Sequence, residues 1–124
     1  MALLSRIEGP AYALMRIVAG FLFMFHGLQK IFGMFGGTAV PLVTQAGVAG
    51  IIEISAGILI MVGLFTSIAA LIASGEMAAA YFIAHAPRAF WPIHNSGELA
   101  ALYCFVFLYI AARGSGIWSI GGRR

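Results

Sequence analysis

The stretch "FLFMFHGLQKIFG" places His26, Gln29 and Lys30 within about one helical turn of each other, at the end of an otherwise apolar run. Two acidic residues, Glu53 and Glu76, are likewise surrounded by apolar residues in later segments. Imidazole, amide, ammonium and carboxyl groups can together donate hydrogen bonds to a substrate and exchange protons with it. These side chains are therefore the first candidates for catalysis or binding.

The composition indicates that these polar groups lie in a membrane. The chain has 124 residues, of which 62% are hydrophobic and 9% are charged, and its mean hydropathy is +1.01. These values lie outside the range of soluble domains. The basic residues are scattered singly, which does not favour nucleic-acid binding. Because Cys104 is the only cysteine, the chain has no internal disulfide and no thiolate cluster. We expect no intrinsic cofactor.

Apolar segments long enough to cross a bilayer occur at approximately residues 11–33, 46–65, 67–86 and 97–113. Each approaches the roughly 20 residues that a helix needs to cross the hydrocarbon core. The breaks between them are short and contain glycine or proline, so neighbouring helices should be antiparallel. The sequence therefore predicts an all-α fold, a single domain over residues 1–124 that forms an integral membrane four-helix bundle of up-down-up-down topology.

Basic residues and small residues predict the orientation and the packing of these helices. Positive charge gathers at the chain ends, which should place both termini in the cytoplasm. The terminal basic residues are Arg6, Arg113, Arg123 and Arg124, whereas Lys30 and Arg88 lie near the opposite loops. Small residues on the second and third helices should form close helix contacts. They are Gly47, Gly50 and Gly57, and Ala69, Ala73 and Ala80.

Charged groups inside a bilayer cost about 2.5–3.5 kcal/mol each, so we expect them to point inward and to pair. His26 and Glu53 lie at a similar depth, roughly 10 Å below the outer surface, and are expected to meet in one pocket. A proton shared between His26 and a glutamate is a hypothesis that follows. The candidate catalytic residues are His26, Glu53 and Glu76. The candidate pocket residues are Arg16, Gln29, Lys30, Glu98 and Tyr109.

Structural interpretations remain open for several of these residues. Arg16 either pairs with Glu76 or extends to the cytoplasmic surface, and Lys30 could extend to the opposite surface. Glu98 could act as the N-terminal charge of the last helix. His85 lies about 180° around its helix from Glu76, which favours a loop or interface contact. A metal held by histidine and carboxylate ligands is conceivable, but we assign no metal site.

Four blocks of sequence resemble the DoxX family of small membrane proteins. They are "LMRIVAGFLFMFHGLQKIFG", "GIIEISAGILIMVGLFTSIAALIAS", "GEMAAAYFIAHAP" and "NSGELAALYCFVFLYIAARGSGIWSI". The resemblance implies an inner-membrane protein, often linked to redox stress, thiol homeostasis or quinone-dependent oxidation. DoxD-type relatives are thiosulfate:quinone oxidoreductase subunits, and some DoxX proteins anchor soluble redox partners. The family's polar positions match Arg16, His26, Gln29, Lys30, Glu53, Glu76, His85 and Glu98, with no established catalytic roles.

Three functions are compatible with these observations. The first is a subunit of a membrane redox process, linked to a quinone or to thiol and sulfur chemistry, with quinone as substrate and with Phe23, Phe25, Phe105 and Tyr109 as aromatic walls. The second is a non-catalytic adaptor that recruits a soluble redox enzyme. The third is a small proton-linked transporter that depends on homo-oligomers. Expected partners are the lipid bilayer, a redox protein and a second copy of the chain, and not nucleic acid.

Overall fold

The computed structural model describes residues 1–121, and every regular element in that range is helical. The elements are α1 (Ala2–Ser5), α2 (Glu8–Phe32), α3 (Gln45–Val62), α4 (Thr66–Ala80), η1 (Tyr81–His85), α5 (Pro92–Asn95) and α6 (Glu98–Arg113). The segment η1 is a π-helix that continues α4 directly. Arg123 and Arg124, which contribute to the expected orientation, lie outside the described residues.

Each of the four expected apolar segments coincides with a long helix to within a few residues. Three helices are long and apolar enough to cross a membrane: α2, α3 and the continuous helix Thr66–His85. The fourth, α6, has 16 residues and is shorter. An all-α membrane protein is thus supported by length and composition.

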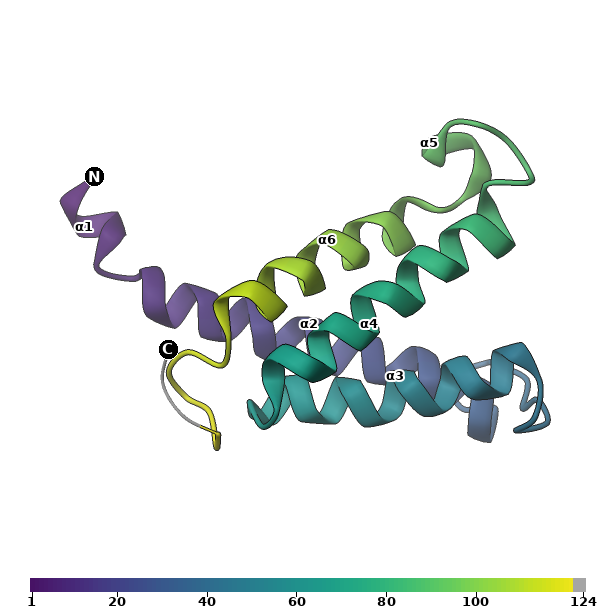
Figure 1. Cartoon of the computed structure of the whole chain (residues 1–124), viewed down its shortest axis with the longest axis horizontal. Helices are drawn as coiled ribbons and strands as arrows, with labels where there is room; N and C mark the ends of the chain where they lie inside the picture. The colour runs from purple at the N-terminus through teal and green to yellow at the C-terminus, as the bar shows by residue number, and fades with distance from the viewer. Residues whose placement is uncertain (122–124) are drawn as a thin grey trace.

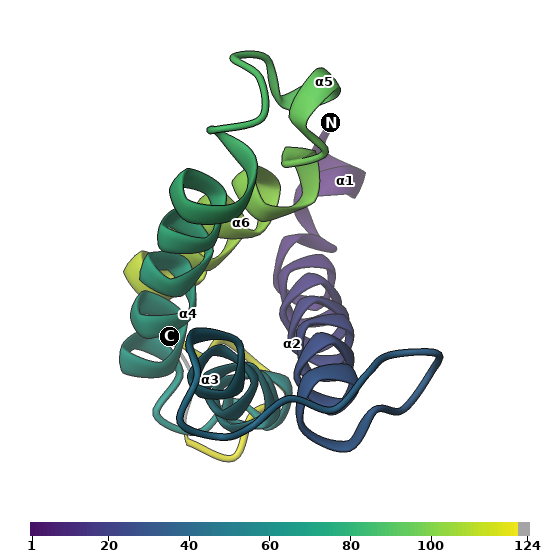
Figure 2. The same cartoon turned by 90° about the vertical axis from the view of Figure 1, so that its right-hand side faces the viewer.

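The long helices form two pairs that are joined through α3 and α4. Helix α2 packs along α3, α4 packs along α6, and α3 contacts α4. Successive long helices run in alternating directions, and both chain ends lie at the same end of the molecule (Figure 1). The view in Figure 2 shows α2 and α4 on either side of α3. Figure 1 also shows that α4 diverges from α3 with distance from the turn that connects them.

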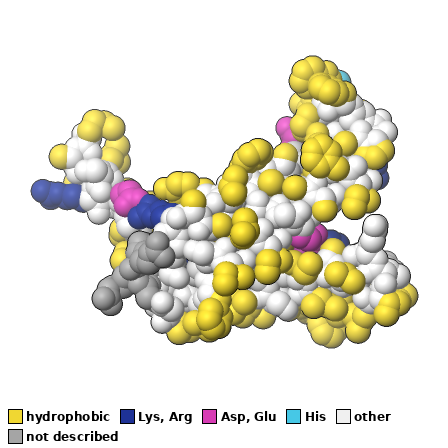
Figure 3. Space-filling model, viewed as in Figure 1, with side chains coloured by type: hydrophobic (Ala, Val, Ile, Leu, Met, Phe, Trp, Pro, Cys, Tyr) yellow, Lys and Arg dark blue, Asp and Glu magenta, His cyan; other side chains and the backbone are white. Residues whose placement is uncertain are grey.

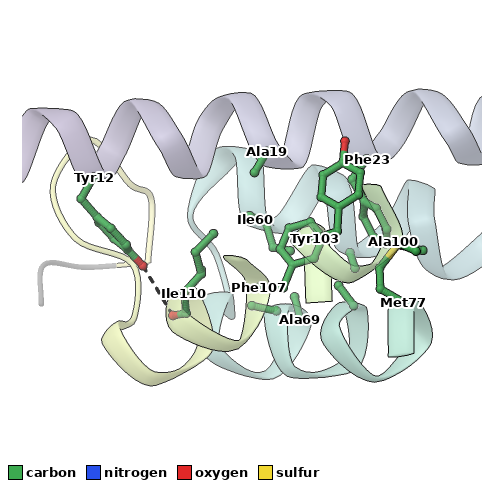
Figure 4. Close-up of a cluster of buried hydrophobic side chains, with 13 residues drawn as sticks. Tyr12, Ala19, Phe23, Ile60, Ala69, Met77, Ala100, Tyr103, Phe107 and Ile110 are labelled. Carbon is green, nitrogen blue, oxygen red and sulfur yellow. Dashed lines mark hydrogen bonds between the residues drawn. The ribbon is translucent and has the colours of Figure 1, made fainter. Parts of the chain in front are cut away.

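The centre of the molecule is filled by aromatic side chains between α2 and α6 (Figure 4). Phe23 and Phe107 are fully buried, and their ring centroids are 4.7 Å apart. Tyr103 completes the cluster at 5.5 Å from Phe23. Buried Ala69 and Ala73 on α4 are small enough to let this cluster pack closely. Large apolar side chains instead cover the exterior (Figure 3), as a lipid environment requires.

Helices α2 and α3 touch backbone to backbone at two pairs of glycines. A Cβ atom at Gly20 would lie 2.6 Å from the carbonyl oxygen of Gly57, and one at Gly57 would lie 2.8 Å from the carbonyl oxygen of Gly20. Two turns further along α2, a Cβ atom at Gly27 would lie 2.6 Å from the carbonyl oxygen of Gly50. The expected contact role of Gly50 and Gly57 is confirmed, and Gly20 and Gly27 are their partners.

Replacing Gly57 by alanine should destabilise the protein, because the new methyl group meets backbone atoms of α2 that cannot move aside. We expect the free energy of unfolding to fall by about 1–3 kcal/mol. Thermal or denaturant unfolding in detergent, followed by circular dichroism, measures this change.

The matched control is Gly75→Ala, since no heavy atom lies within 4 Å of a Cβ atom at that position in α4. That control should be neutral or slightly stabilising, because alanine favours helix more than glycine does. Equal stability of the two variants would contradict the glycine-contact account.

Candidate functional site

A buried ion pair joins the last turn of α2 to the middle of α3. Lys30 Nζ lies 2.7 Å from Glu53 Oε2, and the Glu53 side chain is 0% exposed. The close helix contact brings the two residues together: a Cβ atom at Gly50, one turn before Glu53, would lie 3.1 Å from Lys30 Cβ. Lys30 therefore turns inward to Glu53 instead of extending to the membrane surface.

Glu76 adds a second carboxyl group from α4. It interacts electrostatically with both Glu53 and Lys30. The Oε1 atoms of Glu53 and Glu76 are buried and have no hydrogen-bond partner among the described residues. The Lys30–Glu53–Glu76 cluster thus combines one cation and two carboxyl groups from three helices, with two acceptor positions left unused.

A pocket of about 560 Å³ opens where α4 and η1 diverge from α3, and we call it the α3–α4 pocket. Lys30 and Glu76 are its charged residues, and its remaining lining is mainly apolar. Acidic and basic groups are visible in the hollow between the two helix pairs in Figure 3. The apolar walls include Val48, Ala49 and Ile52 from α3 and Ala79, Ala80 and Ile83 from α4 and η1. A largely apolar pocket of this size with a few charged groups is typical of small-molecule binding sites.

The π-helix η1 contributes to the mouth of the α3–α4 pocket. The Ala86 N–H donates to the Tyr81 carbonyl oxygen at 2.8 Å, five residues back, which widens the helix locally. Ile83 and Ala84, within η1, line the pocket. His85 lies outside it, with Nδ1 3.1 Å from the Asn95 carbonyl oxygen, so the expected loop contact of His85 is confirmed.

His26 and Gln29 lie near the cluster but do not line the pocket. The His26 ring meets the edge of Tyr103, with centroids 6.1 Å apart, and Tyr103 in turn interacts electrostatically with Glu53. Gln29 donates from Nε2 to the Phe35 carbonyl oxygen at 3.0 Å and so holds the loop after α2. Tyr103 was not among the sequence candidates, because its phenol lies on a helix face that reads as ordinary core.

Arg16 lies at the other end of the molecule, where it neither pairs with Glu76 nor extends to the surface. It is fully buried, and its guanidinium donates to four carbonyl oxygens. Two of these belong to Ile60 and Met61 at the end of α3, at 2.9 and 3.0 Å. The others belong to Ile117 and Trp118 after α6, at 3.2 and 2.7 Å. Arg16 thus fastens the C-terminal segment to the end of α3.

The remaining sequence candidates lie outside the α3–α4 pocket. Glu98 is exposed in the first turn of α6, where its charge complements the helix dipole. Tyr109 is 53% exposed, and its ring packs edge-on against Tyr12. Phe23 is buried in the core and Phe105 faces outward, so neither forms a pocket wall. Within residues 1–121, no three His, Cys, Asp or Glu side chains gather as a metal site would require.

The sequence model of the DoxX family matches residues 11–86, a range that contains the Lys30–Glu53–Glu76 cluster and the whole lining of the α3–α4 pocket. The chain belongs to the DoxX family. This DoxX protein is 42% identical over 118 residues to an uncharacterized protein of Haemophilus influenzae, a match that covers 90% of this chain and 88% of that relative. No solved structure matches it. Helix α6 lies outside the range of the family match.

The position of Arg16 predicts a structural role that is separate from the pocket. In the Arg16→Lys variant, one ammonium group replaces a planar fork that reaches four carbonyl oxygens. We expect the free energy of unfolding to fall by about 1–3 kcal/mol, because the buried carbonyl group of Ile60 and three partly buried carbonyl groups lose donors. We also expect faster limited proteolysis between Gly114 and Gly121.

Arg6→Lys is the control, because Arg6 is exposed at the start of the chain and the same change should have little effect there. Unchanged stability and unchanged proteolysis in Arg16→Lys would contradict the proposed fastening role.

Proposed function

We propose that this DoxX protein is a subunit of a membrane redox process and binds a quinone, or a similar hydrophobic molecule with a polar ring, in the α3–α4 pocket. The observation that carries the proposal is an apolar pocket between candidate membrane helices with Lys30 and Glu76 among its lining residues. The electrons would come from a thiol or sulfur compound, or from a redox protein that docks on this subunit.

The proposal includes a single domain of four membrane helices in up-down-up-down order. Helix α6 would extend about 24 Å at 1.5 Å per residue, somewhat less than the hydrocarbon core, and bilayers adapt to a mismatch of this size. Its exposed side chains Leu102, Phe105 and Leu108 are suited to lipid. Arg6 and Arg113 lie near the shared end of the chain termini and favour the cytoplasmic side of the inner membrane for that end.

The chemistry of a quinone explains the composition of the pocket. Reduction to a quinol adds two electrons and two protons, so the site must hold the carbonyl oxygens and deliver protons to them. The Lys30 ammonium donates hydrogen bonds, and the Glu76 carboxyl group can exchange a proton. The alanine, valine and isoleucine walls exclude water from the ring.

A bulky residue in the pocket should remove the ligand without loss of the fold. Ala79 is exposed and lines the pocket, so the Ala79→Phe side chain would fill it. We expect quinone extracted from purified wild-type protein in nanodiscs at about one molecule per chain, and a loss of most of it in Ala79→Phe.

Ala112→Phe is the matched control, since Ala112 is also exposed but lies on α6 outside the pocket. Ala112→Phe should retain the quinone. Empty, well-folded protein in all three forms would contradict the proposal and favour the adaptor function described below.

Removal of the ammonium group should weaken quinone binding without abolishing it. In Lys30→Met the apolar walls remain, but the charged hydrogen-bond donor is lost. We expect the dissociation constant to rise roughly 10- to 100-fold, the value of one charge-assisted hydrogen bond. Quenching of protein fluorescence during quinone titration measures it, with Glu98→Gln as the control outside the pocket. An unchanged constant would place the quinone elsewhere.

A second candidate function is a membrane adaptor for a soluble redox enzyme. The loop between η1 and α6 supports it, because the loop is held in a defined shape and presents apolar residues. Buried Asn95 donates to Tyr81 and to the Ala89 carbonyl oxygen, while Phe90 and Trp91 are exposed. An adaptor would need this loop and no ligand. Proton flux into protein-containing liposomes would instead favour the transporter hypothesis.

A further inference from the structure

The Lys30–Glu53–Glu76 cluster contains more acid than base. Lys30 is its one cation, and it already contacts Glu53 Oε2 at 2.7 Å. With both carboxyl groups ionised the cluster would carry a net charge of −1. A net charge among apolar membrane helices costs several kcal/mol, so the groups that surround the cluster decide how it is neutralised.

Each helix packed against the cluster contributes titratable or charged side chains. Helix α2 supplies Lys30 and, four residues earlier, His26, whose ring meets Tyr103. Helix α6 supplies the Tyr103 phenol, which interacts with Glu53 and is neutral in its ordinary form. Helices α3 and α4 supply Glu53 and Glu76 themselves. No second lysine or arginine forms an ion pair with Glu53 or Glu76 among the described residues.

The two carboxyl groups also have acceptor positions that are not satisfied. Glu53 is 0% exposed, and its Oε1 atom has no hydrogen-bond partner in the described part of the chain. The Oε1 atom of Glu76 is also buried and has no hydrogen-bond partner in the described part of the chain. A buried carboxylate oxygen without a donor is unfavourable by about 1–3 kcal/mol, or more when it is charged. One proton between the two groups would supply a donor and remove the excess charge at once.

We propose that Glu53 and Glu76 share one proton, so that the cluster is a neutral proton-holding site beside the α3–α4 pocket. Two interacting carboxyl groups beside a single ammonium group do not both ionise in such surroundings, so the pair keeps one proton at neutral pH. Lys30 balances the remaining negative charge. Glu53 is sealed within the protein, whereas Glu76 lines the pocket, so exchange of the proton passes through Glu76.

The site would serve the redox chemistry directly, and this use rests on the proposed function. The O–H bond of the carboxylic acid breaks as an O–H bond forms to the oxygen of the quinone that receives electrons from its reductant. The pair, then doubly ionised beside Lys30, regains a proton from the aqueous phase through the pocket and delivers the second proton of the quinol in the same way. The two electrons come from the thiol or sulfur compound, or from the redox protein that docks on this subunit. The shared proton itself does not require a quinone.

Infrared spectroscopy of quinone-free protein tests the shared proton. A protonated carboxyl group gives a C=O stretching band that ionised carboxylates lack, and the band shifts in D₂O. We expect this band in wild-type protein at neutral pH. It should be lost in both Glu53→Gln and Glu76→Gln, because the glutamate that remains then becomes the ionised partner of Lys30.

Two further variants distinguish a shared proton from a carboxyl group that has only a structural role. In Lys30→Met the cation is absent, so both carboxyl groups should be protonated and the band area should rise about twofold. Glu98→Gln, at the exposed start of α6, should leave the band unchanged. Circular dichroism and gel filtration establish that each variant is folded.

Several outcomes overturn the proposal. A wild-type spectrum without the band at neutral pH means that both groups are ionised. A band that persists in Glu53→Gln means that Glu76 is protonated by itself. A band that disappears when Na⁺ is added means that a metal cation can replace the proton between the two carboxyl groups. The band without quinone binding would refute only the proposed function, whereas quinone binding without the band would refute only the shared proton.

Discussion

A carboxylate that is wholly enclosed among membrane helices needs a cation in contact with it, and the Lys30–Glu53 ion pair meets this need. The pair depends on how closely α2 approaches α3. Glycines at positions 20, 27, 50 and 57 bring the two backbones together, and a Cβ atom at Gly50 would crowd Lys30 itself. The glycine contacts therefore fix the distance over which Lys30 reaches Glu53, and the position of the pair locates the charged end of the pocket.

The two ends of the bundle have contrasting structures. At the end near the chain termini, Arg16 binds carbonyl groups from α3 and from the C-terminal segment. Ser115 bonds to Thr66 there at 2.7 Å, which also holds the start of α4. At the opposite end α4 and η1 diverge from α3, and small residues such as Ala49 and Ala79 leave the α3–α4 pocket between them. A fixed end and an open end are suited to a protein that binds a molecule from the bilayer.

The long helices and the inward position of Glu53 and Glu76 could be predicted from the sequence, because apolar length and the cost of buried charge are local properties. The cation that pairs with Glu53 could not be predicted in this way. His26 and Lys30 share a face of α2, and the choice between them depends on the crossing of α2 over α3. Gly20 and Gly27 carried a usable signal, since their spacing of seven residues equals that of Gly50 and Gly57. The role of Arg16 depends on Ile117 and Trp118, about a hundred residues away, and no periodicity reports such a contact.

The proposed site of quinone binding is the α3–α4 pocket beside the Lys30–Glu53–Glu76 cluster. Photolabelling with an azido-quinone in nanodiscs, followed by peptide mass spectrometry, tests it most directly. Quinone binding in this pocket predicts labels within residues 43–52, which comprise the start of α3 and the two residues before it, and within residues 76–84 of α4 and η1. These labels should be lost when excess unlabelled quinone competes. Labels spread over the lipid-facing surfaces of α2 and α6 that unlabelled quinone does not displace would contradict it.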